Sequence, residues 1–250
     1  MNFTRLRDFT PARVGLGRAG SSVPTRELLA FQLAHAHARD AVHARLDAQA
    51  LVLELSPRKC LMLRSAAPDR STYLRRPDLG RRLSEESIRV LSAERGTFDS
   101  AFVIADGLSA LAVARHGSRM LETILKRLAG LQWTVAPIAI VEQGRVAIGD
   151  EVAASLGASL AVVLIGERPG LSSSDSLGIY LTWNPRLGVT DADRNCISNI
   201  WAEGLSYEAA AHRVMFLMTE ARSRRLSGVE LRENASDSQI LGNHVTLLGQ

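Results

Sequence analysis

The side chains best suited to chemistry in this 250-residue chain lie between residues 160 and 199. An apolar run at residues 160–165 has the length and β-branched content of a strand that is buried on both faces. It ends in a loop rich in glycine, proline and serine at residues 166–175, and Glu167 is the second residue of this loop. Cys196 lies in a polar stretch that follows the next apolar run. Because open α/β sheets bind ligands where strands end in loops, we interpret this region as the rim of a ligand site.

Two earlier apolar runs are predicted to end at the same edge. The run at residues 101–105 is followed by Asp106, and the run at residues 135–141 is followed by a loop at residues 142–145 that leads to Val146. Helical segments separate these runs, and an alternation of strand and helix with short loops is typical of a parallel sheet with right-handed crossovers. At its turn position, the Asp106 side chain is expected to cap the backbone amides that follow it.

These elements predict an α/β fold: a Rossmann/flavodoxin-like parallel sheet flanked by helices, with an N-terminal helical extension. The extension is predicted to contain a long helix that begins after an N-cap at Thr25 and runs to about residue 50. We divide the chain into an N-terminal arm and helical extension at 1–97, an α/β domain at 98–232, and a flexible polar tail at 233–250.

Composition narrows the class of protein. Hydrophobic residues make up 46% of the chain, which is enough for a sizeable core, and the formal net charge is +4. The arginines are spread out without interleaved aromatic residues, which disfavours a nucleic-acid interface. Cys60 and Cys196 lie far apart without metal-ligand spacing, so neither a disulfide framework nor a metal site is expected. No run approaches the roughly eighteen apolar residues of a membrane span, and residues 1–20 do not resemble a secretory signal. We therefore expect a cytoplasmic protein.

Two further motifs could bind an anion or a nucleotide. The first has two possible roles, and the second lacks the secondary structure that a nucleotide site requires. Residues 73–83 hold four arginines around a Pro-Asp-Leu-Gly turn. This segment is either a solvated loop or a contact for an anion or a partner, because arginine binds carboxylate and phosphate with two donors at once. Residues 15–20 match the spacing G-x-G-x-x-G, but no strand precedes them, so a dinucleotide site is disfavoured.

Taken together and in order, five motifs resemble the small (light) subunit of ethanolamine ammonia-lyase. The resemblance covers residues 10–230. The motifs are GRAG at 17–20, LRRPDLGRRL at 74–83, DGLS at 106–109, GERPGL at 166–171 and DRNCISNI at 193–200.

The resemblance implies a function for the chain. The family's enzyme uses adenosylcobalamin to convert ethanolamine to acetaldehyde and ammonia by a radical mechanism. A large (heavy) subunit carries the substrate pocket, and the small subunit covers the cofactor from the other side in a hetero-oligomer with six copies of each chain. By resemblance, Val146, Glu167 and Cys196 contact the cobalamin, and this chain holds no catalytic residue. The implied location is the cytoplasm or a bacterial microcompartment.

The expected mode of cofactor binding follows from a missing pattern. Many cobalamin proteins carry Asp-x-His-x-x-Gly after a strand, so that the histidine replaces the cofactor's own base on cobalt. No histidine of this chain lies in that pattern, and His116 has no aspartate two residues before it. We therefore expect the benzimidazole base of the cofactor to stay on cobalt, while the protein binds and orients the cofactor.

Two other functions compete with this one. A stand-alone α/β hydrolase could use a serine at residues 172–174 beside Asp175, but the chain lacks the Gly-x-Ser-x-Gly elbow. A nucleotide-binding regulatory module of flavodoxin type would share the predicted fold. Partner dependence separates these hypotheses, since a subunit of the lyase should have no turnover when it is purified alone.

Overall fold

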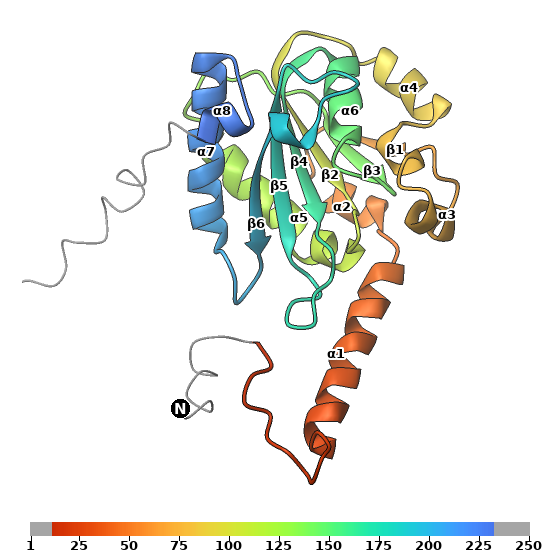
Figure 1. The fold of residues 1–250 in the computed structure, drawn as a ribbon. Coiled ribbons are helices and arrows are strands. Elements are labelled where there is room, and N and C mark those ends of the chain that lie inside the picture. Colours follow the sequence, from red (N-terminus) through yellow and green to blue (C-terminus); the bar gives the residue numbers. More distant parts are fainter. Residues whose placement is uncertain (1–11, 233–250) are drawn as a thin grey trace, which may run out of the picture.

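A computed structural model describes residues 12–232, and the predicted tail at 233–250 lies outside the described residues. Its centre is a six-stranded sheet with the strand order β1-β3-β2-β4-β5-β6 (Figure 1). The strands are β1 (Cys60–Arg64), β2 (Phe98–Ala105), β3 (Ile138–Glu142), β4 (Ala158–Gly166), β5 (Leu177–Trp183) and β6 (Arg194–Ile200). The predicted α/β class is therefore confirmed.

The sheet is mixed, which corrects the expectation of a parallel sheet. Strands β1, β3, β2 and β4 pair in parallel, but β5 is antiparallel to both β4 and β6. The reason lies in the connection between β4 and β5. This connection, at residues 167–176, contains no helix, and a parallel neighbour would require a crossover of a dozen or more residues. The chain therefore turns back at the rim and forms an antiparallel pair.

Helices cover both faces of the sheet (Figure 1). One face packs against α2 (Ala48–Glu54), α5 (Ala110–Leu128) and α7 (Tyr207–Arg224), and the other packs against α4 (Glu85–Ser92) and α6 (Ile148–Leu156). In β2, Phe102 and Ile104 join the first core cluster while Ala101 and Val103 join the second. This alternation is the period of two that a strand imposes, and it accounts for the unbroken apolar run in a strand buried on both faces.

Helix α6 leaves part of its face of the sheet uncovered. It packs against β2 and β4, whereas α7 packs against β5 and β6 from the opposite face. Consequently Ile179 and Leu181 on the α7 side of β5 are fully buried, but Tyr180 on the other side is only half-buried. The α6-side surface of β5 and β6 is therefore partly open around Tyr180 and Cys196, and we call this surface the open face.

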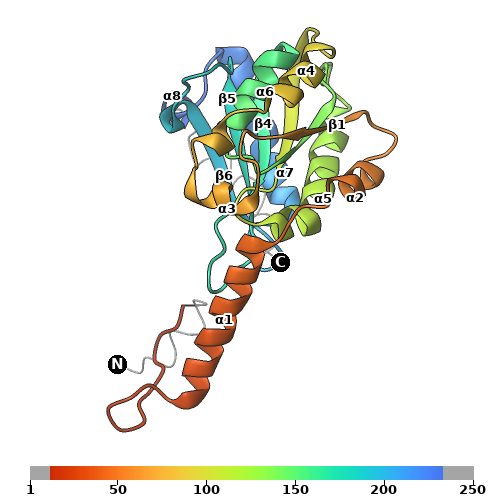
Figure 2. The same cartoon turned by 90° about the vertical axis from the view of Figure 1, so that its right-hand side faces the viewer.

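The N-terminal extension differs from the predicted long helix. The chain forms α1 (Thr25–His43), then an irregular stretch at residues 44–47, and then α2. Thr25 is the first helical residue rather than the cap, because Pro24 occupies the cap position and its side chain makes no capping bond. Helix α1 projects away from the body of the protein (Figure 2). No helix within residues 12–232 is long and apolar enough to cross a membrane.

Candidate functional site

The carboxyl ends of β2 and β4 meet through two glycines. Leu108 donates its N–H to the carbonyl oxygen of Gly166 at 3.0 Å. Gly107 has φ +56°, and a Cβ on it would lie 2.2 Å from the same oxygen. A Cβ on Gly166 would lie 2.0 Å from the carbonyl oxygen of Ser109. Only glycine permits this contact, and it fixes the position at which Glu167 leaves β4.

The side chain of Glu167 is held over the start of β5. Its Oε2 accepts the hydroxyl of Ser176 at 2.7 Å and the backbone N–H of Asn199 at 3.2 Å. Gly178 makes room for it, because a Cβ there would lie 2.9 Å from Oε1 of Glu167. Oε1 accepts no hydrogen bond from the described residues. One carboxylate oxygen is therefore anchored while the other is available to a donor from outside the chain.

The structure brings the three predicted site residues to one side of the sheet. Val163 and Ile165 of β4 face α6, and Glu167 continues this alternation two residues later. Val146 packs against the same core cluster, on the α6 side of the sheet. Cys196 is exposed and lies opposite Tyr180 in the β5–β6 register. The polar stretch around Cys196 indicated a loop after the preceding strand, but Cys196 lies within β6. Its polar neighbours suggested a loop because one side of this edge strand is open.

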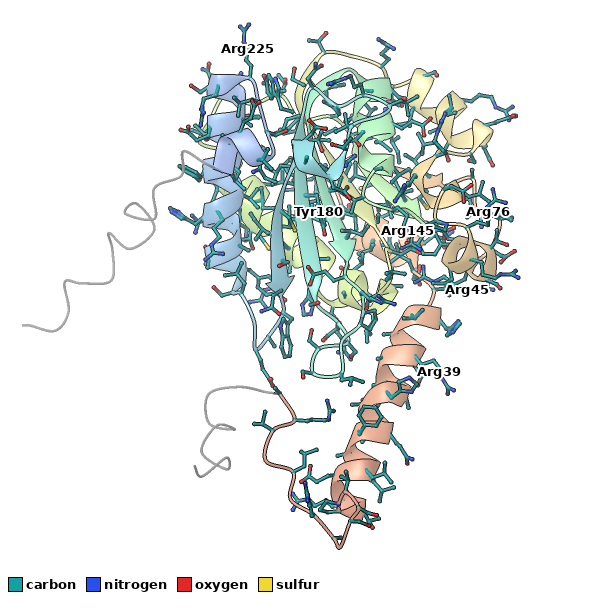
Figure 3. The ribbon with its side chains drawn as sticks, in the orientation of Figure 1. Arg39, Arg45, Arg76, Arg145, Tyr180 and Arg225 are labelled. Atoms are coloured by element: carbon teal, nitrogen blue, oxygen red, sulfur yellow. The ribbon has the colours of Figure 1, made fainter. Side chains whose placement is uncertain are left out.

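Tyr180, which the sequence did not indicate as a site residue, lies at the centre of the open face (Figure 3). Burial raises the pKa of its phenol, and the nearby Cys196 and Glu167 raise it further. The phenol therefore stays protonated and can donate a hydrogen bond across this surface. The alternation of Gly178, Tyr180 and Thr182 on one side of β5 was a signal that could have revealed this surface.

Strand β6 is fastened to α6 beside the open face. Arg194, at the start of β6, forms a buried ion pair with Asp150 of α6 and also bonds the carbonyl oxygen of Val189 at 3.0 Å. Burial raises the pKa of Asp150, and Arg194 opposes this rise. Because Cys196 is two residues from Arg194, this ion pair fixes the edge of the open face on which the thiol lies.

A buried group of aromatic and charged side chains supports the loop before Val146. Tyr73, in α3 (Arg70–Arg75), donates its hydroxyl to the carbonyl oxygen of Gly144 at 3.1 Å. The guanidinium carbons of Arg70 and Arg145 lie 4.8 and 4.3 Å from the centroid of the Tyr73 ring. Such cation–π contacts contribute roughly 0.5–2 kcal/mol each. The loop that carries Val146 is therefore held by α3.

Asp106 is buried in this group, and its predicted capping role is wrong. Its Oδ1 accepts the backbone N–H of Gly144 at 3.0 Å and its Oδ2 accepts Arg70 Nη1 at 3.1 Å. The cap of α5 is instead Ser109, whose hydroxyl accepts the N–H of Ala112. Burial raises the pKa of Asp106 to about 6, against the opposing effect of Arg70 and of the loop amides. Asp106 thus ties the end of β2 to the loop after β3.

Asp175 anchors the loop that follows Glu167. Its Oδ2 lies 2.7 Å from Arg115 Nη1 and 3.5 Å from His116 Nε2, both of α5. His116 Nδ1 in turn lies 2.6 Å from the hydroxyl of Tyr207. Burial lowers the pKa of His116, and Asp175 opposes this effect. These contacts hold the loop against α5, and His116 in turn joins α5 to α7.

The hydrolase hypothesis receives no support from this geometry. His116 contacts Asp175 and Tyr207, and no hydrogen bond joins it to a serine at residues 172–174. A serine nucleophile needs a base within hydrogen-bond reach. Within the described part of the chain, no group of three or more His, Cys, Asp or Glu side chains could hold a metal ion.

The chain matches a known family along nearly all of its length. Residues 1–232 match the family model "Ethanolamine ammonia-lyase light chain (EutC)". The chain is 57% identical to the ethanolamine ammonia-lyase small subunit of Azotobacter vinelandii, over 95% of this chain and 90% of that protein. It is 56% identical to those of Pseudomonas fluorescens Pf0-1, over 92% and 86%, and Xanthomonas campestris pv. campestris B100, over 96% and 90%. The chain belongs to the ethanolamine ammonia-lyase light-chain family.

Proposed function

We propose that this chain is the cofactor-contacting small subunit of an adenosylcobalamin-dependent ethanolamine ammonia-lyase. It would act with a large subunit, in a hetero-oligomer with six copies of each chain, and the large subunit would hold ethanolamine. Membership of the light-chain family supports the enzyme class. The observation that supports the cofactor proposal is that Glu167, Val146 and Cys196 all lie on the α6 side of the sheet, with Cys196 on the open face itself.

The open face fits one side of a flat, amide-fringed ligand. The edge of the corrin ring carries amide side chains, which donate N–H groups, and Glu167 Oε1 is an acceptor without a partner in the described chain. The absence of a side chain at Gly178 lets the Glu167 carboxylate lie over the start of β5, and this fixes the position of that oxygen. Tyr180 and Val146 add half-buried apolar surface, which suits the large, mostly apolar contact area of a cofactor site.

The residues of this chain would bind and orient the cofactor rather than react. Adenosylcobalamin, when bound, supplies the radical chemistry of the conversion of ethanolamine to acetaldehyde and ammonia. Glu167 would accept amide N–H groups, and the apolar surface around Val146 would exclude water. The chain contains no Asp-x-His-x-x-Gly pattern, so we propose that it supplies no ligand to cobalt and that the cofactor keeps its own base.

Replacing Glu167 with alanine should raise the Kd for adenosylcobalamin by roughly 10- to 100-fold, because a hydrogen bond to a charged group contributes about 1.5–3 kcal/mol. The Kd is measured by spectroscopic titration of the complex formed with the large subunit. Ser176→Ala is the matched control, since it removes an anchor of Glu167 at 2.7 Å but leaves the carboxylate in place. An unchanged Kd in an assembled Glu167→Ala complex would remove Glu167 from the cofactor site.

Cofactor binding should also protect the Cys196 thiol from alkylation. Cys196 is exposed, whereas Cys60 at the start of β1 is half-buried and lies on the opposite edge strand of the sheet. The complex with the large subunit is treated with iodoacetamide with and without adenosylcobalamin, and the labelled peptides are counted by mass spectrometry. Labelling of Cys196 should slow when the cofactor is present, while labelling of Cys60 stays the same. Equal protection at both cysteines would indicate a general tightening of the complex instead.

A further inference from the structure

Helix α1 is long but has little contact with its own chain. It contains 19 residues, of which only Ala41, near its carboxyl end, is buried. Its length is roughly 28 Å at 1.5 Å per residue, and most of it lies beside the body of the protein rather than on it (Figures 1 and 2). In proteins, most of the stability of a helix comes from the packing of its apolar side chains against another surface. Another surface must therefore contribute to its stability.

The exposed apolar residues of α1 lie on two sides of the helix. Leu28 and Phe31 are three apart and form one stripe, and Leu29 and Leu33 are four apart and form the other. Leu29 and Leu33 are 57% and 58% exposed, among the most exposed large hydrophobic residues of the described chain. Phe31 is partly covered by the guanidinium of Arg13, 5.8 Å from its ring centroid. A helix that is apolar on two sides is typical of one that is enclosed by other surfaces.

Unpaired arginines surround the base of this helix. Arg39 and Arg45 lie at the end of α1 and just after it, and Arg145 lies on the same side of the molecule (Figure 3). Among the described residues, none of these three guanidinium groups forms an ion pair, whereas the neighbouring Arg64 and Arg70 do. A partner that covers this side would therefore meet unneutralised positive charge, which favours a surface that carries carboxylates.

The position of α1 indicates which partner covers it. The helix leaves the body at the same end of the sheet as the loop that follows Glu167 (Figure 1). Arg13, in the segment before α1, donates to the carbonyl oxygen of Leu171 in that loop at 3.5 Å. A chain that covers the cofactor from this edge is therefore in position to contact α1 as well.

We infer that α1 is a docking arm for the large subunit. Its Leu29 and Leu33 would enter an apolar groove on that subunit, and carboxylates at the rim of the groove would meet Arg39 and Arg45. The inference rests on the proposed function, because it takes the large subunit to cover the cofactor edge. A second copy of this chain is the competing occupant.

The test is the affinity of the full-length chain for the large subunit, measured without cofactor by biolayer interferometry. The double variant Leu29→Ser/Leu33→Ser should raise the Kd at least about tenfold, because it removes the apolar surface of two leucines that the interface would bury. Leu187→Ser is the matched control, because Leu187 is 56% exposed in the loop between β5 and β6. Circular dichroism of the isolated chains establishes that the variants are folded.

A charge-reversal pair keeps the test independent of the stability of α1. Arg39→Glu/Arg45→Glu should weaken binding and reduce its dependence on salt, because rim charges act through the long-range field. Arg225→Glu, at the far end of the molecule from α1 (Figure 3), is the control. Unchanged affinity in both double variants would overturn the inference. So would a dimer of the isolated chain that Leu29→Ser/Leu33→Ser converts to a monomer without loss of affinity for the large subunit.

These outcomes remain separate from those of the cofactor proposal. Glu167→Ala should leave assembly with the large subunit unchanged and weaken only the binding of adenosylcobalamin. If assembly depends on Leu29 and Leu33 but the Kd for the cofactor does not depend on Glu167, the results support α1 as the docking arm and contradict the proposed cofactor site. The opposite pair of results would retain the cofactor site and remove α1 from the interface.

Discussion

Replacing Gly166 with alanine should lower the free energy of unfolding by at least about 3 kcal/mol, at the upper end of the usual range for single substitutions. The added Cβ would lie 2.0 Å from the carbonyl oxygen of Ser109 and 2.6 Å from that of Asp106. Both obstacles are backbone atoms of the turn between β2 and α5, so no side-chain rotation can relieve the clash. Either β4 must separate from the turn after β2 or the turn must distort.

The change is measured by urea denaturation of the isolated chain, followed by circular dichroism. Gly170→Ala is the matched control in the same loop, because a Cβ there would lie 3.4 Å from the carbonyl oxygen of Ser173, an ordinary contact. The control should stay within about 1 kcal/mol of the native chain. Equal stability of the two variants would show that the contact between β2 and β4 is not close in solution. A folded Gly166→Ala protein should also bind adenosylcobalamin less tightly, because Glu167 would be displaced.

The strands that could be predicted from the sequence are those buried on both faces. Continuous apolar runs identified β2, β3, β4 and β5, because these are the inner strands of the sheet. A strand that is covered on both faces is apolar along its whole length. Strand β1 was missed, since its residues alternate between buried and exposed over only five positions. Strand β6 was missed because Arg194, Asn195 and Cys196 at its start are polar or small. Both are edge strands, whose composition reflects their open sides as much as their pairing.

The loops at the strand ends were predictable, but the partners of their side chains were not. The rule that ligands bind at the carboxyl ends of strands indicated the loops after β3 and β4, whereas Val146 and Glu167 were named through the resemblance to the light-chain family and stay predictions. Asp106 satisfied the same rule but was given a local role, whereas its partners Arg70 and Gly144 are 36 and 38 residues away. Capping preferences describe neighbours in sequence, and a buried carboxylate is instead satisfied by whatever the fold brings to it.

The buried carboxylate of Asp106 gives a second large effect, which depends on pH. Asp106→Asn should destabilise the protein by about 1–3 kcal/mol at pH 7, because the single acceptor oxygen of asparagine leaves a buried N–H of Arg70 or Gly144 without a partner. The pKa of Asp106 is raised to about 6 in the folded protein, against about 3.9 for an unperturbed aspartate. The folded state therefore binds this proton more tightly than the unfolded state does. The resulting stabilisation is fully present below about pH 4 and is lost as the pH rises through about 6.

The native chain gains this proton-linked stability on acidification, but the asparagine variant cannot. The destabilisation caused by Asp106→Asn should consequently be larger at about pH 4.5 than at pH 7, by about 2 kcal/mol. Urea denaturation of both proteins at the two pH values measures this difference, and comparing the proteins cancels the titration of all other groups. Asp69→Asn is a contrasting control, because hydrogen bonds from Thr72 lower the pKa of that exposed carboxyl. Its linked stability is lost only below about pH 4, so its difference should stay nearly the same at the two pH values. A larger destabilisation at pH 7 would contradict this prediction. It would mean that Arg70 lowers the pKa of Asp106 by more than burial raises it, and that an ion pair between charged groups joins the two strand ends.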